Sequence, residues 1–256
     1  MITIGGRAHT MSEVREVASM GYPFIEVSLD DPESVESWVP ELLDIREDTG
    51  IVYLAHFPNE NDPFDAVRLR KLFVPKIKAL IDLSAALGVG KATMHFWMDR
   101  RWAPEGLIPR KIELLGEICA YAASSSLTVC IENLSEKADS FQAAFDAIPT
   151  LRMTLDIGHG ELLSRENTSY GFIERFMDRI AHVHVHDNKG GTSVHDDLHL
   201  CLGDGRVDFP AILAALVDRG YDSTITMEVK PSDMRRTLDA IIRCIPGASG
   251  GVRSRP

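Results

Sequence analysis

The sequence has few cysteines, no long apolar run and a deficit of positive charge, and each absence excludes a class of protein. The four cysteines form no CxxC pair and have no regular spacing, which is typical of reduced thiols in a cytoplasmic protein. No segment approaches the roughly 20 apolar residues of a membrane span. No basic start precedes an apolar stretch, as it would in a secretory signal peptide. We therefore expect a cytoplasmic location and no membrane partner.

The charge balance and length narrow the choice further. Lys and Arg number 27 against 38 Asp and Glu, a formal net charge of −11, which argues against nucleic acid as a general partner. Hydrophobic residues make up 45% and charged residues 25%, which are ordinary globular values. A chain of 256 residues has room for one large domain or two small ones.

Short apolar segments rich in Val, Ile, Thr and aromatic residues alternate with helical patterns. Eight such segments predict strands at 2–5, 24–29, 51–57, 91–97, 127–133, 152–158, 180–186 and 223–229. Among the intervening helical patterns are 12–21, 67–88, 111–123 and 209–220, the second interrupted by Pro75. Eight units in 256 residues give 32 residues per strand–helix unit.

This alternation predicts an α/β fold with a parallel sheet, closed into a single-domain (β/α)8 TIM barrel of about 250 residues. An open doubly wound sheet is the competing fold. It usually carries a glycine-rich first turn, and Gly5-Gly6 lacks the rest of that fingerprint. We expect the barrel to span residues 1–246. The Gly-, Ser- and Arg-rich segment 247–256 is expected to be a flexible tail.

Ionisable side chains gather where the predicted strands end, which is where barrels of this kind carry their active sites. In chain order they are His56, His95, Glu132, Asp156, His159, the histidines at 182, 184 and 186, and Glu228. Residues two apart in a strand share a face. So many inward ionisable groups would be costly unless they were paired or bound a metal. Imidazole and carboxylate without thiolate suit Zn²⁺, Mn²⁺, Co²⁺ or Fe²⁺.

The long polar loop at 186–209 follows the seventh predicted strand. Long loops at this end of a barrel are usually functional. Asp197 and His199 lie two residues apart in the loop, a spacing that allows both to bind one metal. Gly203 and Gly205 permit a tight turn, which we expect to bring this pair back over the barrel mouth.

Four short motifs lie at or after the ends of predicted strands: ENL at 132–134, LDIGH at 155–159, HVHD at 184–187 and DLHLCLGDG at 197–205. Together these motifs resemble the xylose isomerase-like TIM barrels. That family includes sugar isomerases and epimerases and the endonuclease IV-type apurinic endonucleases of AP endonuclease family 2. The resemblance runs from the first strand to about residue 245.

The resemblance implies roles for individual residues. Four match the ligands of the common metal in sugar epimerases: Glu132, Asp156, His184 and Glu228. Glu132 and Glu228 also match the glutamates that exchange the substrate proton, and His159 matches a histidine near the substrate. The resemblance to the trinuclear zinc site of the endonucleases adds His56, His95, His159, Asp197 and His199 as metal ligands. We therefore expect from about one to about three divalent ions per chain, with Zn²⁺ or Mn²⁺ favoured.

The loops depart from the endonuclease pattern. The segment 57–65 contains Glu60, Asp62 and Asp65 where those enzymes carry side chains that enter DNA, and the segment 30–34 is also acidic. Acidic groups at both positions would repel a phosphodiester backbone. The first interpretation is therefore a metal-dependent isomerase or epimerase of a sugar, sugar phosphate or related polyol, acting through an enediolate. A trinuclear-zinc phosphoesterase is the alternative, and a dehydratase or lyase or a non-catalytic binding barrel is also considered.

Some residues outside the ligand set are expected to contact substrate. Arg100 and Arg101 follow the fourth strand and could hold a phosphate or carboxylate through paired hydrogen bonds, or be a solvated pair. Lys230 and His186 are the other substrate-binding candidates. Glu26 is expected to support a ligand histidine, and His182 to be a hydrogen-bonded interior residue. Exposed aromatic residues at 38, 64 and 73 would suit a homo-oligomer contact.

Overall fold

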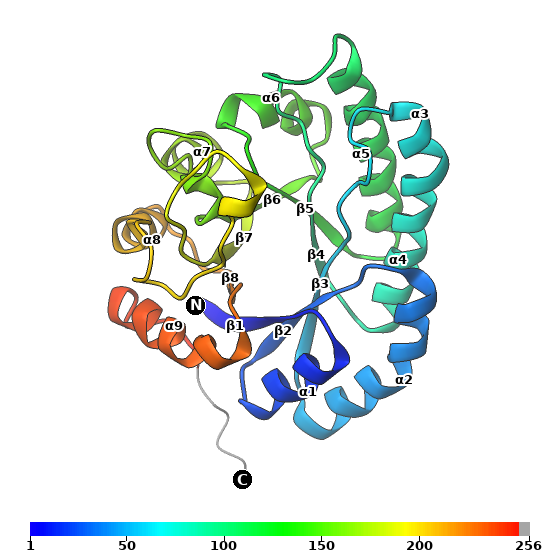
Figure 1. The fold of residues 1–256 in the computed structure, drawn as a ribbon. Helices are drawn as coiled ribbons and strands as arrows, with labels where there is room; N and C mark the ends of the chain where they lie inside the picture. The colour runs from blue at the N-terminus through cyan, green and yellow to red at the C-terminus, as the bar shows by residue number, and fades with distance from the viewer. Residues whose placement is uncertain (251–256) are drawn as a thin grey trace.

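The eight predicted segments form the strands of the computed structural model, which describes residues 1–250 (Figure 1). The strands are β1 Thr3–Ala8, β2 Phe24–Ser28, β3 Val52–His56, β4 Lys91–Met94, β5 Thr128–Glu132, β6 Arg152–Asp156, β7 Ile180–Val185 and β8 Thr224–Met227. All neighbours pair in parallel, and β8 pairs with β1 to close the barrel in sequence order. The predicted TIM barrel is confirmed.

The helices form a ring outside the strands (Figure 1). They are α1 Met11–Ser19, α2 Pro32–Thr49, α3 Ala66–Arg68, α4 Val74–Ala86, α5 Leu107–Ser124, α6 Ala138–Ala147, α7 Ser169–Phe176, α8 Phe209–Asp218 and α9 Pro231–Cys244. The predicted interruption at Pro75 is confirmed. A π-helical turn at Leu69–Phe73 runs directly into α4, and Pro75 is the second residue of α4. Because proline has no N–H, it interrupts the α-helical hydrogen bonding at this junction.

The barrel interior is polar where most barrels carry aliphatic side chains. Gly5 faces inward and leaves room for the Phe24 side chain. Gly6 faces outward against Met234 of α9. Near the amino ends of the strands, the Lys91 ammonium donates to the Thr224 hydroxyl at 2.8 Å. Aliphatic packing is therefore concentrated between the sheet and the helices, and the interior is left to hydrogen-bonding groups.

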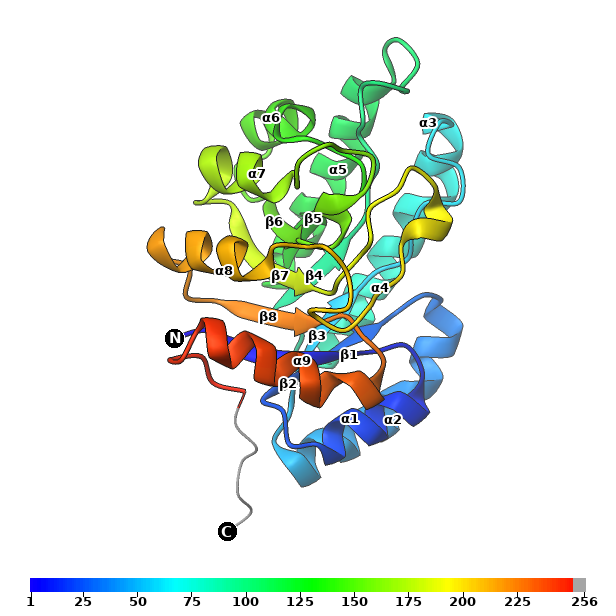
Figure 2. The ribbon, with the colours of Figure 1, turned by 60° about the vertical axis from the view of Figure 1, so that its left-hand side comes forward.

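The carboxyl ends of the strands all point to one end of the barrel. The loop between β7 and α8, yellow in Figure 2, lies at that same end.

Two further observations concern the membrane and cysteine predictions. Within residues 1–250 no helix is both long and hydrophobic enough to cross a membrane. All four cysteines are free thiols.

The division into a barrel and a tail at residue 247 stays a prediction, and Ser249 and Gly250 of that segment contact β1 and α9. Ser249 accepts a backbone hydrogen bond from Ile4 at 2.9 Å and donates one to Ile2 at 2.8 Å. Gly250 packs against Leu238. The remaining part of the predicted tail, 251–256, lies outside the described residues.

The three aromatic residues considered for a subunit contact differ in exposure. Phe64 is 49% exposed. Phe73 is buried and stacks on Phe96, so the expectation that it is exposed is wrong. Trp38 is partly buried against the core. A homo-oligomer stays a prediction.

Candidate metal centre

Four side chains from consecutive strands meet at the carboxyl end of the barrel. Glu132 ends β5, Asp156 ends β6, His184 lies on β7 and Glu228 follows β8. Each offers one ligand atom, and these atoms all lie within 4.8 Å of one another. All four residues are buried. We call this set the central group.

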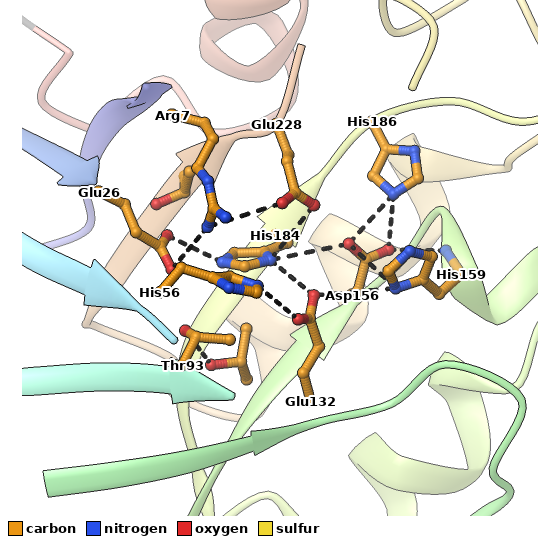
Figure 3. Close-up of polar contacts among 12 residues, drawn as sticks. Arg7, Glu26, His56, Thr93, Glu132, Asp156, His159, His184, His186 and Glu228 are labelled. Carbon is orange, nitrogen blue, oxygen red and sulfur yellow. Dashed lines mark hydrogen bonds and ion pairs between the residues drawn. The ribbon is translucent and has the colours of Figure 1, made fainter. Parts of the chain in front are cut away.

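The His184 ring is surrounded by the three carboxylates of the central group (Figure 3). Its Nδ1 atom lies 2.7 Å from Glu132 Oε1, 3.4 Å from Glu228 Oε2 and 3.8 Å from Asp156 Oδ2. Three carboxylates around one imidazole nitrogen form an oxygen-rich donor set, which suits a divalent cation of intermediate softness.

A second group lies beside the first and shares a glutamate with it. His56 Nε2 and His95 Nε2 lie 3.1 and 3.0 Å from Glu132 Oε2. The ligand atoms of these three residues again lie within 4.8 Å of one another. Glu132 therefore faces the central group with one oxygen and the second group with the other.

A third group lies next to Asp156, whose Oδ1 atom is 3.0 Å from His186 Nε2. It consists of His159, His186, Asp197 and His199. Asp197 Oδ2 lies 3.1 Å from both His159 Nε2 and His199 Nε2. The structure thus brings together all nine residues predicted as ligands. It adds His186, which the sequence predicted only as a substrate contact.

The loop at 186–209 folds back as predicted. The main chains of Asp187 and Leu200 form an antiparallel bridge. The Asp187 carboxylate accepts hydrogen bonds from the Gly203 and Val207 N–H groups at 2.8 and 3.0 Å. A Cβ on Gly205 would lie only 2.2 Å from Asp187 Oδ1. The two glycines therefore allow the turn that brings Asp197 and His199 over the strand ends.

Most of the candidate ligand histidines have their other ring nitrogen held by a protein oxygen. Glu26 accepts from His184 Nε2 at 2.8 Å and from His182 Nε2 at 3.0 Å, as its predicted supporting role requires. Backbone carbonyls lie within 3.1 Å of the Nδ1 atoms of His56, His159 and His199. Such contacts fix the tautomer and the ring orientation that a metal needs.

The electrostatics of the three groups are strongly coupled. Burial alone would raise the pKa of Glu132, but His95 and His184 hold it well below its usual range. Burial opposes ionisation of Glu228 in the same way, and His184 and Arg7 nevertheless lower its pKa. Burial would lower the pKa of His184, but Glu26 and Glu132 raise it well above 6.5. The carboxylates therefore require positive charge from protonated imidazoles or from bound cations.

The donor chemistry fits divalent cations. Five buried or partly buried carboxylates meet here: Glu26, Glu132, Asp156, Asp197 and Glu228. Within residues 1–250, the buried atoms His95 Nδ1, His186 Nδ1 and Glu228 Oε2 have no hydrogen-bond partner. Buried polar atoms are normally satisfied. Metal ligation is one chemistry that would use both the excess negative charge and the unpartnered Glu228 oxygen.

Arg101, one of the two predicted substrate-binding arginines, is held by neighbouring protein groups. Arg101 donates to the Asp99 carboxylate and to the Ser135 carbonyl, and its guanidinium stacks on Trp102. Its donors are therefore largely occupied by protein groups. Arg100 and Lys230 are exposed, and Lys230 directly precedes α9. Substrate contact by these residues stays a prediction.

One acidic side chain used to argue against nucleic acid is not exposed. The Glu60 carboxylate is buried against the Lys111 ammonium and also accepts from the Trp97 N–H at 2.8 Å. Burial raises the pKa of Glu60 to about 7. Glu60 therefore adds little to the surface charge, while Asp65 caps α3 from an exposed position. The charge argument against a phosphodiester is weaker than the sequence suggested.

Sequence reasoning missed Arg7. Its side chain reaches the interior beside Glu26 and Glu228. The expected first strand ended at residue 5, whereas β1 continues to Ala8 and places Arg7 on the same face as Gly5. Extending the strand through the glycine pair would have revealed this inward arginine.

A parallel barrel with ionisable groups at its strand ends defines a class of protein. Comparison of the chain with known families identifies that class. The chain matches the xylose isomerase-like TIM barrel family over residues 14–244 and belongs to it. It is similar to uncharacterized protein MJ1311 of Methanocaldococcus jannaschii, with 27% identity over 209 residues, 75% of this chain and 68% of that one. It is 21% identical to fructoselysine 3-epimerase of Shigella flexneri over 235 residues, 84% of this chain and 83% of that one.

Among solved structures, the fold is similar to that of a D-tagatose 3-epimerase-like protein. The TM-score is 0.82 at 22% identity, and the match covers 95% of this chain and 98% of the other. At this identity the likeness establishes the shared barrel. The activity has to be argued from the residues at the strand ends.

Proposed function

We propose that the protein is a divalent-metal-dependent epimerase or isomerase of a sugar, sugar phosphate or related polyol. The observation that carries this proposal is the pair of glutamates in the central group. Glu132 and Glu228 approach His184 Nδ1 from different strands, at 2.7 and 3.4 Å. Two carboxylates on different sides of one substrate position are what proton removal and return on opposite faces require.

The residues of this chain divide the chemistry between them. One glutamate removes the proton from the carbon beside the substrate carbonyl, and the electron pair moves to the carbonyl oxygen to give an enediolate. The first glutamate releases its proton to solvent, and the other glutamate passes a proton taken up from solvent to the opposite face, which inverts that carbon; return to the neighbouring carbon gives the isomer instead. The chemistry that a divalent cation held by the central group supplies is polarisation of the carbonyl and stabilisation of the enediolate.

The similarity to an epimerase over most of both chains supports this proposal. His159, in the adjoining third group, is placed to orient substrate hydroxyls. A cytoplasmic location is proposed with this activity.

Proton exchange at carbon tests the proposal directly. The metal-loaded protein is incubated in deuterated water with a panel of ketoses and ketose phosphates, and deuterium incorporation is followed by NMR. We expect exchange with one member of the panel, and we expect Glu132→Gln and Glu228→Gln each to lower its rate at least 100-fold. Glu113→Gln, on the exposed face of α5, is the matched control. Full activity in either active-site variant contradicts the proposal.

A trinuclear-zinc phosphoesterase is the second candidate, and the three groups favour it. They offer ligand atoms for up to three cations, more than enediolate chemistry uses. Metal content per chain, measured by elemental mass spectrometry after purification without chelator, separates the candidates. About one ion favours the epimerase. About three zinc ions, together with cleavage of a duplex containing an abasic site, establish the phosphoesterase.

A further inference from the structure

The Arg7 guanidinium is enclosed in the barrel beside the central group. The residue is only 5% exposed. Its Nη2 atom donates to Ser28 Oγ at 2.9 Å. Its Nη1 atom lies 3.4 Å from Glu26 Oε1 and 3.8 Å from Glu228 Oε1, and Figure 3 shows the guanidinium between these two carboxylates, next to His184.

Most of the hydrogen-bonding capacity of Arg7 is unused within the protein. A guanidinium carries five N–H donors. Within residues 1–250, neither Nε nor Nη1 has an acceptor in hydrogen-bonding geometry, and Glu26 Oε1 has no donor. An unsatisfied buried group costs about 1–3 kcal/mol, and more when it is charged. The Arg7 donors and the Glu26 Oε1 acceptor therefore lie beside the central group without hydrogen-bond partners.

We propose that Arg7 is a substrate-binding residue that donates to a hydroxyl oxygen on an uncharged part of the substrate. The same hydroxyl donates to Glu26 Oε1. This inference rests on the proposed epimerase or isomerase function and deepens it. The hydroxyl belongs to a carbon near the reacting one, because Arg7 also lies beside Glu228.

The local charge selects a hydroxyl over a phosphate. Glu26 and Glu228 both approach Arg7 Nη1 within 4 Å, so the guanidinium has no surplus positive charge to offer an anion. A phosphate would place its oxygens, which only accept, next to the unpaired Glu26 oxygen. A hydroxyl both accepts and donates, so it can accept from Arg7 Nη1 and donate to Glu26 Oε1 together.

Calorimetry tests this inference. It measures the affinity of the metal-loaded protein for D-fructose, D-tagatose, D-fructose 6-phosphate and inorganic phosphate. Arg7→Lys keeps the charge but loses the planar fork of donors, and Arg7→Met loses both. We expect either variant to weaken binding of the preferred ketose about 10- to 100-fold, with unchanged metal content. Arg15→Met, in an exposed ion pair with Glu41, is the matched control and should bind as the wild type does.

The outcomes separate this inference from the proposed function. If the wild type binds a ketose and both Arg7 variants bind it with the same affinity, the role of Arg7 is overturned and the proposed function stands. If Arg7→Met does not fold, Arg7→Lys alone decides. Binding of inorganic phosphate more tightly than any ketose, lost in the variants, assigns Arg7 to an anion and overturns the hydroxyl. If the wild type binds none of the sugars, the proposed function fails and this inference fails with it.

Discussion

Replacing Glu26 by glutamine is expected to weaken metal binding although no predicted ligand is changed. The Glu26 carboxylate accepts from His184 Nε2 at 2.8 Å, and so makes His184 Nδ1 more basic toward a cation. Glutamine offers a neutral acceptor of similar shape. Loss of such a supporting carboxylate typically lowers metal affinity 10- to 100-fold, which corresponds to about 1.4–2.8 kcal/mol.

Competition with a zinc chelator of known affinity measures this effect. Glu136→Gln is a suitable control, because Glu136 is also a buried glutamate but belongs to none of the three groups. The melting temperature of the metal-free variant reports whether Arg7, 3.4 Å from Glu26 Oε1, loses a stabilising partner. Unchanged zinc affinity, or an equal loss in Glu136→Gln, would refute the reasoning.

The other predictions concern the loop, the buried ion pair and the cation itself. Gly205→Ala should lower the metal content of the third group, measured by elemental analysis, because its Cβ would lie 2.2 Å from Asp187 Oδ1; unchanged content would contradict this. The pKa of Glu60 is raised above 4.5 to about 7, so its contribution to stability is complete below pH 4.5 and is lost as the pH rises to about 7. That loss is at most about 3 kcal/mol, and the difference in melting temperature between wild type and Glu60→Gln across this pH range should follow it; a constant difference would count against it. Chelation of bound metal should lower the wild-type melting temperature, measured calorimetrically, because the cation binds only the folded chain; equal melting temperatures would exclude occupied sites.

The strands could be predicted because their signal is local. Each is a short run of β-branched, aliphatic and aromatic residues, and that preference is readable one segment at a time. The sequence signal for β1 ends at residue 5 because Gly5 and Gly6 weaken it. The strand continues through them since Phe24 and Met234 fill the space that side chains would occupy. That packing comes from segments distant in the sequence, so it cannot be read from the local pattern. Arg7 lies in the part of β1 beyond the two glycines and was missed for the same reason.

The convergence of the ligands could be predicted from strand parity together with family resemblance. The partners of charged residues on loops could not. Glu60 meets Lys111, 51 positions away, and Arg101 meets the Ser135 carbonyl, 34 positions away. Neither pairing follows from alternation along a strand. Loop charges that looked exposed in the sequence are therefore partly neutralised in the fold, which changes the weight of the argument against a phosphodiester substrate.

The number of bound cations matters more for function than their identity. Glu132 links that number to the reaction. Its Oε1 atom faces His184 at 2.7 Å, and its Oε2 atom faces His95 at 3.0 Å. A glutamate that bridges two cations has both oxygens engaged and can no longer accept a proton from carbon. If the second group is filled, Glu132 becomes a structural bridge and the two-glutamate mechanism loses one of its bases. Occupancy of His56 and His95 therefore decides whether this barrel is equipped for enediolate chemistry or for phosphoester hydrolysis.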